Sequence, residues 1–354
     1  MNLERVEQIA DAVLYEGYML YPYRPSSVKN QRRWNFGVLC PASYCEVEAG
    51  SESPFMQTEC LLRADSTTRL TVKVRFLQIV QRSIGRFIGA ASDGQGSDGT
   101  SVEFVDRLEL DGRVYQPWQE AVERELTYEN LDPASLCSAP PLEFNFFEGI
   151  EVEDLRDARH RRQGMIVRQW QTLSGTVQIR AMACRDDIVK LAVRVENQSH
   201  FDRTAADDYS GREAALPFSL MSAHAVLGVE NGEFLSLLDP PASMADLAEQ
   251  CENKGTFPVL AGEDATAMLA SPIILYDYPS IAPESAGNLF DATEIDEILS
   301  LRILTLTDEE KQEMRESDDR ARELLSRTES MPDEQFIKLH GILRGLGPVK
   351  GEPQ

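Results

Sequence analysis

The residues best suited to chemistry in this sequence are a histidine and an acidic segment. His224 alternates with apolar residues in SLMSAHAVLG, and residues 277–297 hold six carboxylates, among them Asp277 and Glu284. A histidine beside a carboxylate suits a general base, and paired carboxylates serve glycoside hydrolysis. No Gly-x-Ser-x-Gly or Cys-Gly-Ser-Cys motif supplies a nucleophile. A structural histidine and a solvated loop are therefore favoured, with a hydrolase or carbohydrate-binding enzyme as the alternative.

Three of the six cysteines suggest a second kind of chemistry, metal binding. Cys40 and Cys45 are separated by four residues, and Cys60 follows at a distance. Zinc sites combine such a pair with a second pair or with histidines, and no second pair is present here. The sequence therefore predicts no metal or cofactor, and it leaves open whether these cysteines bind a metal. Scattered cysteines also favour a reducing, cytoplasmic location.

The segment 18–34 is a basic, aromatic neighbourhood in an acidic chain. Tyrosine, tryptophan and arginine are enriched at binding hot spots, so this segment is a candidate docking surface for a protein partner. Pairing of its cations with the acidic loop is the alternative, and this attraction predicts that the two ends of the chain meet. The candidate binding residues are Tyr18, Tyr21, Tyr23, Arg24, Lys29, Arg32, Arg33 and Trp34.

The charge of the chain excludes several classes of partner. The 354 residues carry a formal net charge of −24, with an isoelectric point near 4.6. Such a surface repels phosphate backbones, so we expect no nucleic-acid binding. No run approaches the roughly 18 apolar residues of a membrane helix, and the acidic N-terminus is unlike a secretory signal. The sequence therefore predicts a cytoplasmic protein without membrane insertion.

The elements that must position these residues are mainly strands. Residues 70–76 alternate between apolar and polar, and residues 167–195 form a meander of short strands. Asp111-Gly112 and Asn231-Gly232 each predict a hairpin turn. A helix is expected from Leu3 to Gly17, and a capping box at Thr307 and Glu310 starts another. Residues 298–306 are predicted to form a last strand.

These elements predict an α+β fold, predominantly antiparallel β with a sandwich-like core and helices at both termini. Length favours about two domains. We expect an N-terminal helix and β-rich domain in residues 1–131 and a sandwich-like domain with a helical insertion in 142–306. C-terminal helices in 307–344 and a disordered tail in 345–354 complete the prediction.

Three long blocks of the sequence resemble an uncharacterised protein family. They are ADAVLYEGYMLYPYRPSSVKNQRRWNFGVL (10–39), MSAHAVLGVENGEFLSLLDPP (221–241) and a C-terminal block, 271–329, that begins SPIILYDYPSIAPESAGNLF. The family that they resemble is encoded beside actinobacterial-type, oxygen-tolerant NiFe uptake hydrogenases. The resemblance spans nearly the whole chain.

The resemblance implies an accessory role in the maturation or assembly of a NiFe hydrogenase. The family has no assigned reaction, so the resemblance implies no catalytic residues. Nickel delivery generally uses clustered histidine or cysteine, which this sequence lacks. The expectation is therefore a non-enzymatic assembly factor that contacts a hydrogenase subunit or another maturation factor.

Overall fold

The computed structural model describes residues 4–15, 18, 23–24, 27, 36–46, 52–88, 101–202, 211–280, 296–317 and 319–332. The chain divides into two compact units, residues 1–18 with 32–280 and residues 19–31 with 281–354. The predicted fold class, mainly antiparallel β-structure with helices towards both ends, is confirmed. One 11-stranded sheet joins strands from both of the predicted β-rich ranges.

The first unit is organised around β1 (Phe55–Ile88), a strand of 34 residues that exchanges partners along its length. Residues 61–63 pair with two strands at once, which places those strands on opposite sides of β1. The ranges 70–77, 81–82 and 84–86 also pair with two strands each, and the two partners again lie on opposite sides of β1. One side of β1 binds β10 (Ile188–Asn197), β5 (Trp118–Leu131) and β2 (Ser101–Val105) in turn. The other side binds β11 (Met221–Leu235) and β8 (Arg162–Trp170).

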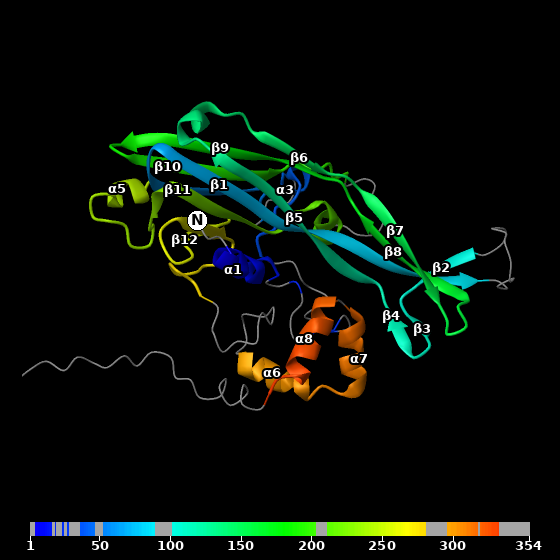
Figure 1. Cartoon of the computed structure of the whole chain (residues 1–354). Coiled ribbons are helices and arrows are strands. Elements are labelled where there is room, and N and C mark those ends of the chain that lie inside the picture. The colour runs from blue at the N-terminus through cyan, green and yellow to red at the C-terminus, as the bar shows by residue number, and fades with distance from the viewer. Residues whose placement is uncertain are drawn as a thin grey trace, which may run out of the picture. The chain divides into compact units, whose positions relative to one another are not determined.

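The remaining strands extend this sheet at its edges (Figure 1). From β11 the sheet continues through β13 (Ala267–Ser271) to β12 (Phe257–Leu260). From β10 it continues through β9 (Leu173–Arg185) to β6 (Leu142–Phe146), and β7 (Gly149–Arg156) pairs with β8. The short helical turns of this unit are α3 (Ala42–Cys45), η1 (Pro133–Ser138), α4 (Arg212–Ala215), η3 (Leu216–Phe218) and α5 (Ala245–Ala248).

The main core lies inside a curl of this sheet. The alternation predicted for residues 70–76 is confirmed, because Leu70, Val72, Val74 and Phe76 are all buried in one cluster. The ring of Phe76 lies 5.9 Å from that of Phe144 in β6. Two strands, β10 and β9, separate β1 from β6 in the sheet order. Flat spacing would put the two strands roughly 14 Å apart, so the ring contact requires the sheet to curve around its apolar contents.

The predicted N-terminal helix is confirmed as α1 (Glu4–Leu14), and it covers the opposite face of the sheet. Its apolar residues pack on β11, β12 and β13, where Val226 and Leu269 are fully buried. At the helix surface Glu7 pairs with Lys73, and Asp11 accepts a hydrogen bond of 2.7 Å from Arg75. The face of β1 that carries Lys73 and Arg75 is therefore covered by a helix at this level of the strand.

The two predicted hairpin turns have different outcomes. Asp111 and Gly112 both have positive φ and join β3 (Leu108–Leu110) to β4 (Arg113–Tyr115), which confirms that turn. The hairpin at Asn231-Gly232 is wrong, because β11 runs through it as one strand. Asn231, with φ 55°, faces a register shift in β1 between Ala64 and Arg69. The dipeptide therefore forms an irregularity in a continuous strand.

The described C-terminal part of the second unit is mainly helical. It contains α6 (Asp296–Leu304), α7 (Asp308–Ser317) and α8 (Asp319–Glu329). The predicted strand at 298–306 is therefore wrong. The capping box is confirmed, since Thr307 Oγ1 accepts from the Glu310 amide at 3.2 Å and Glu310 accepts from the Thr307 amide at 2.9 Å. None of the described helices has the length and apolarity needed to cross a bilayer.

We expect Phe76→Ala to lower the free energy of unfolding by about 3–5 kcal/mol, because it leaves a cavity where the sheet curls over its core. Phe147→Ala is the matched control, since Phe147 is largely exposed. Chemical denaturation of both variants tests this. A loss below about 1 kcal/mol for Phe76→Ala would contradict a tightly packed curl.

Candidate functional site: an apolar face on four strands

The second half of β1 lies in a four-stranded section with the order β7-β8-β1-β2. Directly opposed residues of an antiparallel sheet project on the same side. Phe104 opposes Gly85, which opposes Met165, and Val167 opposes Ser83 and Val152. The register therefore brings apolar side chains from four strands onto one surface, the four-strand apolar face. Its members are Phe87, Val102, Phe104, Ile150, Val152, Met165 and Val167.

This face is open to solvent. Phe104, Ile150 and Val152 are 62%, 65% and 54% exposed. A side chain at Gly85 would meet Val102 at 2.7 Å and Met165 at 3.1 Å, so this glycine lets the two neighbours close over the strand. Contiguous exposed apolar surface of this kind marks interaction sites in proteins that are otherwise well packed.

The opposite side of the same four strands is covered. Ile84, Leu155 and Ile166 are buried there and pack against Leu108 and Tyr115 of the β3–β4 hairpin. The section is thus a sheet with one face partly covered by a hairpin, where Glu151 and Glu153 stay exposed, and with one exposed apolar face. The exposed apolar residues are therefore not part of the hydrophobic core.

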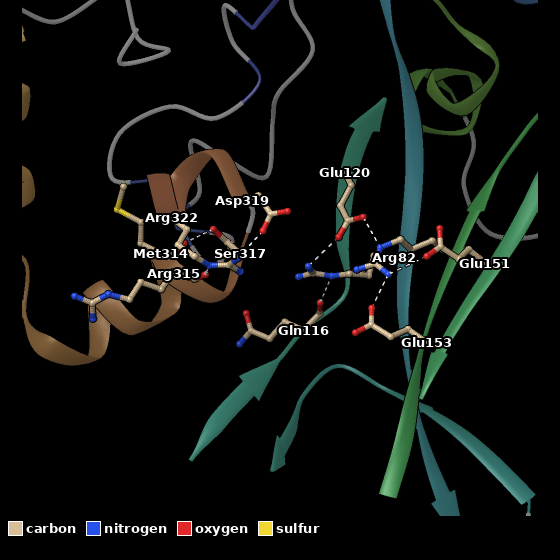
Figure 2. Close-up of polar contacts among 11 residues, drawn as sticks. Arg82, Gln116, Glu120, Glu151, Glu153, Met314, Arg315, Ser317, Asp319 and Arg322 are labelled. Atoms are coloured by element: carbon tan, nitrogen blue, oxygen red, sulfur yellow. Dashed lines mark hydrogen bonds and ion pairs between the residues drawn. The ribbon is translucent and has the colours of Figure 1, made fainter. Parts of the chain in front are cut away.

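An ion-pair network fixes β7 and β8 to β5 and β1 on the covered side (Figure 2). Glu120 bridges two guanidinium groups, at 3.0 Å from Arg82 and 2.8 Å from Arg168. Arg168 also lies 2.9 Å from Glu153 and 4.0 Å from Glu151. Arg82 is largely buried, and its Nε donates to the Gln116 carbonyl at 3.1 Å. This network holds the four-strand apolar face in one shape.

The predicted docking segment 18–34 is described at three of its candidate residues. Tyr18 is buried in the first unit against Tyr15, at 5.6 Å between ring centroids, and Tyr23 is buried in the second unit. Both rings contribute packing rather than exposed surface. The other candidates, Tyr21, Lys29, Arg32, Arg33 and Trp34, lie outside the described residues.

Arg24 shows where the basic segment meets the acidic C-terminal region. Its guanidinium lies 3.1 Å from Glu310 and 3.9 Å from Glu313, both on α7. The expected meeting of the two ends of the chain is thus seen within the second unit. The acidic residues that Arg24 contacts lie on a helix. Residues 281–295 of the acidic loop lie outside the described part.

Elsewhere in this unit, the junction of α7 and α8 is fixed by short-range contacts (Figure 2). Ser317 Oγ donates to the Met314 carbonyl at 2.8 Å. Arg322 donates to the Arg315 carbonyl at 2.9 Å and pairs with Asp319. The helical bend between these helices is therefore held by its own residues.

The candidate general base His224 is fully buried on β11. Its Nδ1 lies 2.8 Å from the Ser222 carbonyl, which only accepts, so Nδ1 carries the proton. Burial, with a smaller effect of the nearby Arg75, lowers the pKa of His224 from 6.5 to about 4. Nε2 is buried and makes no hydrogen bond within the described residues. A neutral, enclosed imidazole fits the structural interpretation of this residue.

Asp277, the proposed carboxylate partner of His224, is occupied elsewhere. It accepts from Ser236 Oγ at 2.5 Å and from the Leu260 amide at 2.8 Å. None of these contacts involves the residues around His224, so the structure does not bring the two groups together as a catalytic pair. The third member, Glu284, lies outside the described residues.

Two of the three candidate cysteines, Cys40 and Cys60, are buried thiols with different neighbours. Cys40 is buried, and desolvation and then the charge of Glu52 raise its pKa to about 12, with a smaller effect of Cys45. Burial is also the main cause of the raised pKa of Cys60, followed by Cys251. Across the described ranges no group of three or more histidine, cysteine or acidic residues is arranged to hold a metal.

Comparison with known proteins adds no relative. No protein-family model matches the chain, and no curated protein matches it significantly. The resemblance to the hydrogenase-associated family therefore stays an expectation.

The buried histidine predicts a pH-dependent stability. The unfolded chain binds a proton at His224 near pH 6.5 and the folded chain near pH 4, so protonation favours unfolding as the pH falls through this window. We expect His224 to remove up to about 3 kcal/mol of stability by pH 4. Denaturation of wild type and His224→Met at pH 7 and pH 4 measures this contribution. An unchanged pH dependence in the variant would contradict it.

The contacts of Asp277 predict a structural role. Asp277→Ala removes the acceptor of the Leu260 amide and of Ser236, and we expect it to lower the free energy of unfolding by about 1–3 kcal/mol. Asp239→Ala, at an exposed carboxylate nearby, is the control and should change it by less than about 0.5 kcal/mol. Equal effects in thermal denaturation would mean that the Asp277 contacts do not stabilise the fold.

Proposed function

We propose that this chain is a non-enzymatic accessory protein that docks a partner protein on the four-strand apolar face. The single observation that carries the proposal is the exposure of Phe104, Ile150 and Val152 on strands whose apolar residues on the other face pack under a hairpin. The hydrolase hypothesis gains no comparable support, because His224 and Asp277 bind different neighbours.

The occupant of this face is a different protein rather than a second copy of this chain. Two copies would each carry a net charge of −24, and this repulsion opposes association. The sequence resemblance supports a subunit or maturation factor of a NiFe hydrogenase as the partner, in the cytoplasm. Binding there would hold a subunit during assembly without any chemical step.

Affinity capture from cells that express the hydrogenase tests this proposal. We expect tagged wild type to recover a hydrogenase subunit or maturation factor, identified by mass spectrometry, and Ile150→Ser with Val152→Ser to lose it by about tenfold or more, as for the loss of two hot-spot side chains. The matched control is Met182→Ser with Leu238→Ser, two exposed apolar residues that are not part of the face.

Two results would overturn the proposal. One is equal recovery by wild type and the Ile150→Ser, Val152→Ser variant. The other is the same loss for the control variant, since that would show a general effect of removing apolar surface. Circular dichroism of all three proteins establishes that each is folded.

A further inference from the structure

The outer edge of β7 borders the four-strand apolar face. β7 pairs with β8 from Gly149 opposite Trp170 to Leu155 opposite Gly164, and no other described strand pairs with it. An edge strand presents a row of unpaired backbone donors and acceptors that another extended segment can bind. The exposed Ile150 and Val152 project beside this edge on the apolar side.

The two sides of β7 differ in chemistry. Ile150 and Val152 lie on the four-strand apolar face, which ends along β7 at Asp154, paired with Arg156 and Arg162. Glu151 and Glu153 alternate with them and project on the covered side. On that side two guanidinium groups, those of Arg82 and Arg168, contact three carboxylates, those of Glu120, Glu151 and Glu153. One negative charge is therefore left over within this network, and Glu151 and Glu153 are exposed.

A second copy of this chain does not suit this edge. The antiparallel registers of two β7 strands that pair Ile150 with Val152, or Val152 with Val152, place Glu151 opposite a glutamate of the other copy. Like charges directly opposite each other destabilise a sheet. Shifting the register by one residue removes this repulsion. It also places the apolar side chains of one copy on the face opposite to those of the other copy, so the apolar face is no longer continuous.

We propose that β7 binds an extended segment of the partner protein as an added strand, in which apolar residues alternate with lysine or arginine. The apolar side chains extend the four-strand apolar face, and the cations oppose Glu151 and Glu153. The backbone supplies hydrogen bonds to the β7 edge. This inference rests on the proposed docking function and specifies the chemistry of the partner.

The test uses a labelled synthetic peptide, Lys-Val-Lys-Ile-Lys-Val-Lys, and fluorescence anisotropy with the full-length protein. We expect saturable binding, weakened about tenfold by Glu151→Gln with Glu153→Gln, as for the loss of two charge pairs. The matched control is Glu143→Gln on β6 with Glu249→Gln at the end of α5, two exposed glutamates away from β7, which should bind as wild type does. Peptide in which glutamate replaces lysine should not bind.

Backbone methylation separates an added strand from simple charge attraction. Alternate amides of an added strand point to β7, so N-methyl groups on one alternate set should abolish binding and those on the other should leave it intact. Equal binding by both methylated peptides, equal weakening by both glutamine variants, or no binding of the lysine peptide would overturn the inference.

The inference and the docking proposal can fail separately in affinity capture of the partner. If Ile150→Ser with Val152→Ser loses the partner and Glu151→Gln with Glu153→Gln retains it at wild-type level, the docking face stands and the added strand is wrong. If the serine variant also retains the partner, the docking function itself is wrong.

Discussion

The pairing of β1 is the constraint on which the rest of the first unit depends. A strand of 34 residues spans roughly 110 Å at about 3.3 Å per residue, far longer than any of its partners. Most of its length is paired on at least one edge because five strands succeed one another along its two edges. The first half of β1 forms the wall of the curled core. The second half carries the sheet beyond that core, where, among the described residues, the β3–β4 hairpin packs on one side of it.

The exposed apolar face follows from this geometry. The β3–β4 hairpin seals one side through Leu108 and Tyr115, and the network of Glu120 with Arg82 and Arg168 stiffens that side. The other side retains Phe104 and Val152 in solvent. A rigid, half-covered sheet is suited to binding because little conformational entropy is lost when a partner adds to it. The shape and the function that we propose thus have the same origin in the length of β1.

Local signals in the sequence predict the elements where side-chain pattern and backbone conformation agree. The alternation through Val72 and Val74, the capping box at Thr307 and the turn at Asp111-Gly112 are of this kind. The hairpin predicted at Asn231-Gly232 is wrong, because a positive φ suits an irregularity within a strand as well as a hairpin turn. Pairing with β1 along both parts of β11 selects the irregular strand. The strand predicted from the apolar run after Asp296 is wrong, because the periodicity of a short apolar segment does not distinguish a strand from a helix.

The four-strand apolar face could not be predicted from the sequence, because apolar residues occur on both sides of its strands. Met165 and Ile166 are adjacent in β8, yet Ile166 is buried under the hairpin and Met165 lies on the exposed side. Which side is covered depends on where β3 and β4 fold back. The composition of the sequence instead predicted a docking surface in the aromatic segment around Tyr23, where the described rings are buried.

Photo-crosslinking in living cells is the most direct test of the claim that a partner covers the four-strand apolar face. A photoreactive phenylalanine analogue would replace Phe104 in cells that express the hydrogenase, with the same analogue in place of Met182 as the control. We expect an adduct with a hydrogenase subunit or maturation factor from position 104 and none from position 182. The absence of an adduct at position 104, or equal adducts from both positions, would contradict it.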